Sequence, residues 1–150
     1  LFYGYFAPIE QYIAGLKDSR LPDFDQRRKV GTILKDLDFI KQNLYFPTQE
    51  FAIPEIQSFP QALGALYVME GSTLGGKFIA NMISRQLNLN SAYGLSFFTG
   101  YGEATEKMWK GFLHIIDDPN LSLVEKEAVI FSAKNTFLHF TAVVKQHYTD

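Results

Sequence analysis

The chain of 150 residues has the size of one domain, and its 47% hydrophobic and 20% charged residues are typical of a globular protein with a sizeable core. A net charge of −2 argues against a nucleic-acid or membrane-surface partner, since both favour a basic protein surface. The absence of cysteine excludes disulfides, thiolate ligands and cysteine nucleophiles and is compatible with the cytosol, and no apolar run reaches the roughly eighteen residues of a membrane span. The composition therefore predicts a soluble, cytoplasmic protein.

The first half of the chain predicts two helices and a loop. Apolar residues at spacings of three and four predict a helix over 1–16, in which Pro8 predicts a kink or a break. A second helix is predicted from Asp23 to about Asn43. Its apolar face is expected to consist of Val30, Ile33, Leu34, Leu37 and Ile40. Residues 44–57 contain two prolines and mixed polarity, which indicates a loop.

The second half predicts three further helices. A long helix over 58–89 begins with a capping-box pattern, in which a serine is followed three residues later by Gln61. A shorter helix is predicted over 103–117, and a final helix over 122–148 begins with the same pattern, completed by Glu125. No segment alternates with the period of a strand, so we expect an all-α multi-helix bundle that forms a single domain over 1–150.

Three glycines lie close together inside the long helical pattern, at Gly71, Gly75 and Gly76. Each costs about 1 kcal/mol relative to alanine in a helix interior, so the cluster needs a structural reason. A phosphate loop is excluded, because the spacing is wrong and no strand precedes it. A tight helix crossing and a close approach to a planar cofactor both remain open. Ser72 and Thr73 fit a kinked, partly opened turn whose carbonyls need partners.

Residues 67–76, YVMEGSTLGG, resemble the glycine-rich distal helix of bacterial, phytochrome-associated haem oxygenases. Three other segments resemble parts of that family in the same order: residues 2–10 the second helix, residues 94–98 a short stretch that walls the haem pocket, and residues 133–138 the start of the final helix. The resemblance thus covers nearly the whole chain.

The resemblance implies the haem oxygenase fold and the oxygen-dependent cleavage of haem to biliverdin, iron and carbon monoxide. Haem is both cofactor and substrate, and electrons come from a ferredoxin or a reductase. A phytochrome is the implied receiver of biliverdin. The distal helix is expected to kink over the haem, with Gly71, Ser72 and Gly75 at the reacting centre. Ser72 stands where mammalian-type members have an aspartate, which indicates the bacterial subgroup.

The resemblance also implies the haem-contacting residues. They are Phe6, Gly71, Gly75, Gly76, Phe97, Phe98, Lys110, His114 and Phe137. Lys110 and His114, four residues apart on one helix face, are expected to bind the propionates, with Lys107 and Arg85 as nearby alternatives.

The family holds its iron through a histidine on a first helix, which is expected upstream of this chain. His114, His139 and His147 do not stand at that position, so no metal ligand is predicted within residues 1–150.

Two other functions remain open. The chain could be a non-catalytic haem-oxygenase-like module that binds or regulates a partner. A thiaminase-like helical enzyme is the more distant alternative, and the lack of cysteine counts against it.

Overall fold

The computed structural model describes residues 1–16, 18–40, 51–89 and 93–148, and within these ranges the chain forms helices and turns and no strand. The helices are α1 (Phe2–Leu16), the 3₁₀ turn η1 (Phe24–Gln26), α2 (Gly31–Phe39), α3 (Phe59–Leu87), α4 (Ser96–Thr99), the 3₁₀ turn η2 (Gly102–Ala104), α5 (Thr105–Ile116) and α6 (Leu123–Tyr148). The predicted all-α class is confirmed. None of the described helices is long and apolar enough to cross a membrane.

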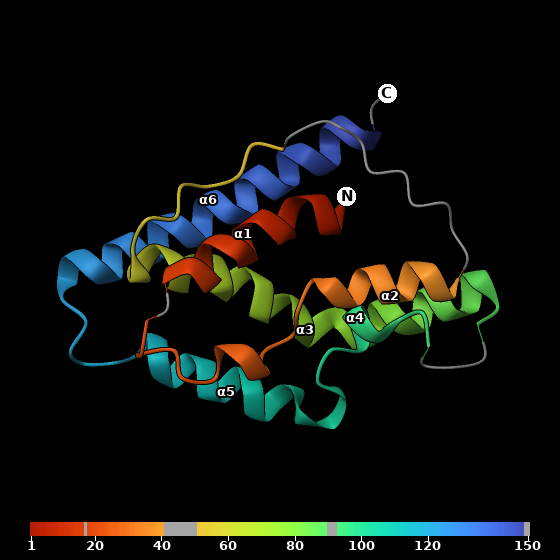
Figure 1. Cartoon of the computed structure of the whole chain (residues 1–150), viewed down its shortest axis with the longest axis horizontal. Coiled ribbons are helices and arrows are strands. Elements are labelled where there is room, and N and C mark those ends of the chain that lie inside the picture. Colours follow the sequence, from red (N-terminus) through yellow and green to blue (C-terminus); the bar gives the residue numbers. More distant parts are fainter. Residues whose placement is uncertain (17, 41–50, 90–92, 149–150) are drawn as a thin grey trace.

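The two longest helices, α3 and α6, form the framework of the fold. Figure 1 shows α3 running along the length of the molecule, with α1 and α6 on one side of it and α5 on the other. The axes of α3 and α6 approach so closely at Gly64 that an added Cβ would lie 2.3 Å from the carbonyl oxygen of Val129. A tight helix crossing therefore exists at Gly64, outside the three-glycine cluster, and a second close approach, that of α4, lies within the cluster at Gly76.

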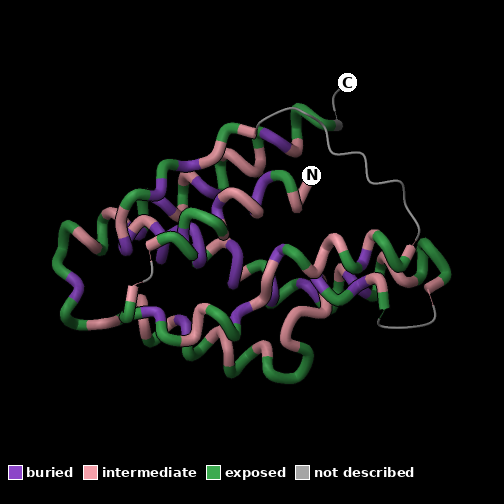
Figure 2. The backbone as a smooth tube through the Cα atoms, viewed as in Figure 1, coloured by how far each residue is buried: buried purple, intermediate pink, exposed green. Residues whose placement is uncertain are grey.

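The core lies where α1, α3, α5 and α6 meet. Its largest fully buried side chains include Tyr5 and Ile9 of α1, Leu63 of α3 and Phe112 of α5. Figure 2 shows buried segments along the inner sides of these helices. The hydroxyl of Tyr5 donates to the backbone carbonyl of Thr136 at 2.7 Å, which ties α1 to α6 with its polar end satisfied.

Helix α3 continues through the glycine cluster without interruption, so the glycines do not break the helix. The hydroxyls of Ser72 and Thr73 donate to the carbonyls of Met69 and Glu70 at 2.7 and 2.6 Å. The expected partners for carbonyls in this turn are therefore present. The helix ends two residues before the predicted end, where Asn88 adopts the left-handed conformation with φ of 51°.

The second predicted helix was wrong in extent, whereas its predicted apolar face is buried at Val30 and half-buried at Ile33, Leu34, Leu37 and Ile40. The chain forms only η1, then an extended residue at Arg27, then α2. The break lets the side chains of Arg27 and Arg28 reach α3, where Arg27 makes a buried hydrogen bond and Arg28 a partly buried one. The predicted end of this helix, at 41–43, and the first part of the loop expected at 44–57 lie outside the described residues.

Within α2 the one buried residue is polar: Asp36. Its carboxylate accepts the backbone N–H groups of Ser96 and Phe97 at 3.0 and 2.8 Å, and also the hydroxyl of Ser96. An acidic group at a helix N-terminus satisfies the free donors of the first turn. Asp36 thereby fixes α4, a helix that was too short to be predicted.

The proline of the first helix and the two predicted capping boxes have different outcomes. Pro8 lies inside α1 without breaking it. The last helix begins with the predicted capping box, because Ser122 and Glu125 each accept the other's backbone N–H. At the start of α3 only part of the box forms: the hydroxyl of Ser58 donates to the side chain of Gln61 and accepts no backbone N–H.

Candidate functional site

An open, largely apolar groove of about 510 Å³ lies between α1, α3 and α6. Its volume is within the range of ordinary ligand pockets, and few polar groups interrupt its walls. The lining residues are Phe2, Phe6, Tyr67, Val68, Gly71, Ser72, Ala133, Lys134, Phe137 and Phe140. The groove therefore joins residues that are more than 130 positions apart in the sequence.

The three clustered glycines have three different environments. Gly71 lines the groove, and a Cβ there would lie 3.7 Å from the ring of Trp109, an ordinary contact. Gly75, one turn later, is exposed, with nothing within 4 Å of an added Cβ. Gly76 is buried, and an added Cβ would lie 2.0 Å from the carbonyl oxygen of Phe98. Gly71 thus leaves room at the groove, whereas Gly76 lets α4 pack directly against α3.

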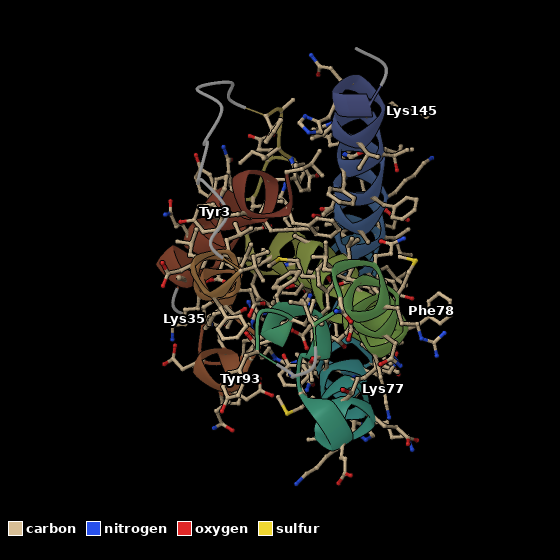
Figure 3. The ribbon with its side chains drawn as sticks, turned by 90° about the vertical axis from the view of Figure 1, so that its right-hand side faces the viewer. Tyr3, Lys35, Lys77, Phe78, Tyr93 and Lys145 are labelled. Atoms are coloured by element: carbon tan, nitrogen blue, oxygen red, sulfur yellow. The ribbon has the colours of Figure 1, made fainter. Side chains whose placement is uncertain are left out.

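Beyond the groove, the same face of α3 carries large apolar side chains with no cover. Leu74 and Phe78 are 53% and 76% exposed, and Phe78 projects away from the helices in Figure 3. The ring of Tyr67, one turn before Gly71, packs on Trp109 with ring centres 5.4 Å apart. Trp109, which is the single tryptophan of the chain, is therefore placed against the wall of the groove.

The α1 wall is a cluster of aromatic rings. Phe2 and Phe6 each lie 5.1 Å from Phe140 of α6, measured between ring centres. Phe2 also contacts the rings of Phe97 and Phe98 at 6.1 and 5.7 Å, which extends the cluster to α4. Such edge-on and tilted rings pack as a rigid surface.

Of the four aromatic residues predicted to contact haem, two line the groove and two pack in or against the core. Phe6 and Phe137 line the groove, and Phe137 is 61% exposed within it. Phe97 is buried in the core and Phe98 is half-buried, and both lie behind Phe2.

The predicted cations do not line the groove. Lys110 is 66% exposed and pairs with Glu106 at 2.6 Å, and His114 is exposed on the same helix, α5. The basic side chain that does line the groove is Lys134 of α6. Lys134 was not among the predicted cations, although it lies three residues before Phe137 and therefore shares its helix face.

A buried network of charged groups lies behind the α3 wall. Arg27 donates to Glu70 at 2.9 Å, and both side chains are at most 3% exposed. Arg27 also pairs with Asp23 at 2.7 Å, and the hydroxyl of Tyr101 lies 2.9 Å from both carboxylate oxygens of Glu70. Burial raises the pKa of Tyr101 above its ordinary value, so this hydroxyl stays protonated.

Arg28 connects this network to the groove. It donates to the carbonyl of Met69 and to the hydroxyl of Ser72, at 2.7 and 2.6 Å. Burial lowers the pKa of Arg28, and the nearby Glu70 carboxylate opposes that change. Neither Arg28 nor its contact with Ser72 could be found from sequence spacing, because the two residues are 44 positions apart.

No group of three or more metal-ligating side chains occurs among the described residues. None of the three histidines, all of which are described, lines the groove. The described protein groups around the groove therefore offer apolar surface, bare backbone, the hydroxyls of Tyr67 and Ser72 and one ammonium group, which suits a flat apolar ligand with acidic substituents.

A smaller hollow of about 350 Å³ lies at the end of α1. Two carboxylates, Asp18 and Asp25, are among its lining residues, and Asp18 is already paired with Arg20 at 2.8 Å. It shares no lining residue with the larger groove.

The fold and the groove define the chain as an α-helical domain with an open apolar groove between α1, α3 and α6. A family model described as Heme oxygenase matches residues 47–146. The chain belongs to the heme oxygenase family, because this match covers most of its length.

The heme oxygenase of Xanthomonas campestris pv. campestris (strain 8004) is similar to the chain. It is 30% identical over 114 residues, which cover 76% of this chain and 66% of that relative. The aligned stretch is thus slightly less than two thirds of the relative's length. No solved structure matches the chain significantly.

Proposed function

We propose that this chain forms the haem-binding part of a bacterial-type haem oxygenase, which cleaves haem with oxygen to biliverdin, iron and carbon monoxide in the cytoplasm. The observation that carries the proposal is the open groove beside Gly71, where bare backbone and aromatic rings form flat walls. A planar macrocycle fits such walls, because Cβ atoms on α3 would otherwise reduce the width of the groove. Membership of the family supports the same ligand.

The chain's own residues would hold the haem by enclosing its apolar faces. Gly71 and Ser72 supply the α3 wall, and Phe6 and Phe137 supply apolar surface from α1 and α6. Lys134 is the groove's cation and fits the carboxylate groups of a propionate edge. Lys110 and His114 remain candidates for that role only if α5 turns its exposed face towards the ligand.

The haem supplies the redox and oxygen chemistry when it is bound, and the protein supplies position and exclusion of water. The aromatic cluster of Phe2, Phe6 and Phe140 makes the α1 side dry and rigid. The hydroxyl of Ser72 is a polar group on the opposite wall, suited to hold an ordered water. A histidine outside residues 1–150 would hold the iron. Electrons come from a ferredoxin or a reductase, and a phytochrome is the receiver of the product.

The test compares haem turnover by the complete protein with turnover by its Gly71→Leu variant. Wild type, supplied with haem, oxygen and a reductant, is expected to release biliverdin, followed by its absorbance, and carbon monoxide. A leucine at this groove-lining position is expected to narrow the groove and stop both products, and its Cβ makes only an ordinary contact with Trp109. Gly15→Leu is the matched control, because Gly15 has open space around it at the end of α1. Haem binding by wild type without product would instead identify a non-catalytic module.

A further inference from the structure

The guanidinium of Arg28 makes hydrogen bonds to three groups, two on α3 and one on α4. Its Nη2 donates to the carbonyl of Met69 and to the hydroxyl of Ser72, while Nη1 donates to the carbonyl of Phe97 at 3.2 Å. The guanidinium carbon lies 4.1 Å from the centre of the Phe97 ring. A lysine has a single nitrogen and cannot reproduce this fork, although it keeps the positive charge.

The backbone at Arg28 is also held in place. Its N–H donates to the hydroxyl of Tyr101 at 2.6 Å, and that hydroxyl contacts the buried carboxylate of Glu70. The preceding residue, Arg27, is fixed to the same carboxylate. The backbone from which the Arg28 side chain extends is therefore held by Tyr101 and, through Arg27, by Glu70.

These contacts leave Ser72 one way to interact with the groove. A serine hydroxyl has one proton and two lone pairs. The proton is used by the Met69 carbonyl, 2.7 Å away, and one lone pair accepts from Arg28. The remaining lone pair is the only hydrogen-bonding capacity that this residue can offer to the groove.

We infer that Arg28 is a positioning residue of the groove, which fixes the Ser72 hydroxyl so that it accepts hydrogen bonds from the groove and does not donate. The α3 wall therefore selects a donor, such as a water molecule, at the turn that carries Gly71. This inference rests on the proposed function, because haem is the probe that reports on the wall.

The experiment measures the stretching frequency of carbon monoxide as a probe of the wall. The chain is loaded with haem in the presence of imidazole, which supplies an axial ligand, then reduced and exposed to carbon monoxide. A hydrogen-bond donor near the carbon monoxide oxygen lowers the frequency, whereas a fixed acceptor does not. Wild type is expected to give a single band.

Arg28→Lys keeps the charge but releases the Ser72 hydroxyl, which can then turn its proton towards the groove. A second band at lower frequency is expected in this variant, and it should be absent from Arg28→Lys/Ser72→Ala. Ser72→Ala alone, which retains the Arg28 contacts with both carbonyls, should give one band, shifted to lower frequency by the loss of the lone pair. Arg20→Lys is the matched control, because Arg20 contacts Asp18 and Phe59 away from the groove, and it should match wild type.

Four results would overturn the inference. An unchanged spectrum in folded Arg28→Lys would remove the role of Arg28, while haem binding by the same samples would leave the proposed function intact. A second band that persists in the double variant would mean that Arg28 acts on the helix and not through Ser72. Failure of wild type to bind haem with imidazole would overturn the proposed function together with the inference. If Arg28→Lys does not fold, an unshifted band in Ser72→Ala is the deciding contrary result.

Discussion

Two adjacent glycines of α3 should respond to alanine in opposite directions. At Gly75 an added Cβ meets nothing within 4 Å, so Gly75→Ala should gain the helix propensity of alanine, about 1 kcal/mol. At Gly76 the Cβ would lie 2.0 Å from the carbonyl oxygen of Phe98, far inside an ordinary contact. The contacted atom belongs to the backbone of α4, so a change of side-chain rotamer cannot relieve the overlap. The overpacking cost should therefore be about 3 kcal/mol, the upper end of the usual range. After the propensity gain, Gly76→Ala should lose about 2 kcal/mol.

The assay is urea denaturation of the two variants and wild type, followed by circular dichroism without ligand. The expected order of stability is Gly75→Ala, wild type, Gly76→Ala, with about 3 kcal/mol between the extremes. Equal stability of the two variants would refute the packing argument, because they differ only in what the added methyl contacts. A destabilised Gly75→Ala would show that this face of α3 is already covered in the ligand-free protein.

The remaining predictions concern the buried polar groups. Glu70→Gln removes one of the two carboxylates that pair with buried Arg27, Asp23 being the other, and should cost about 2 kcal/mol in urea denaturation, whereas Glu106→Gln at an exposed pair should cause no measurable change; equal small effects would contradict the burial of the network. Burial raises the pKa of Tyr5 above the ordinary value of about 10, so the unfolded chain loses this proton first. Stability should therefore fall as the pH rises above about 10, with a smaller fall in Tyr5→Phe, where the raised pKa of Tyr101 still contributes; an equally steep fall in that variant would assign the effect to other groups.

The sequence predicted the parts of the fold that depend on local pattern. Apolar periodicity and the Ser122 capping box located α6, and the same periodicity located α3 to within two residues of its end. It failed at Arg27 and Arg28, since the break there serves hydrogen bonds to α3 that no local pattern records. It also missed that Asp36 is buried, because the acceptor role of this carboxylate depends on α4, 60 positions away.

In the candidate site too, local pattern indicated a segment, and contacts between distant residues decided the role of each side chain. The glycine cluster indicated a stretch of α3 that borders the groove at Gly71, but only the packing distinguishes Gly71 at the groove, Gly75 in open space and Gly76 against α4. Family spacing placed the cations on α5, whereas the groove is lined by Lys134 of α6. The haem-contacting roles of these residues remain predictions that the experiments above address.

The most direct test of the account is a haemin titration followed by the fluorescence of Trp109, the single tryptophan, whose ring adjoins Gly71. With imidazole present as an axial ligand, haemin should quench this fluorescence with a sharp one-to-one end point. Gly71→Leu should abolish the end point, and Gly15→Leu should leave it unchanged. Quenching without a one-to-one end point, or an end point that survives in Gly71→Leu, would contradict the claim that the groove between α1, α3 and α6 is the haem site.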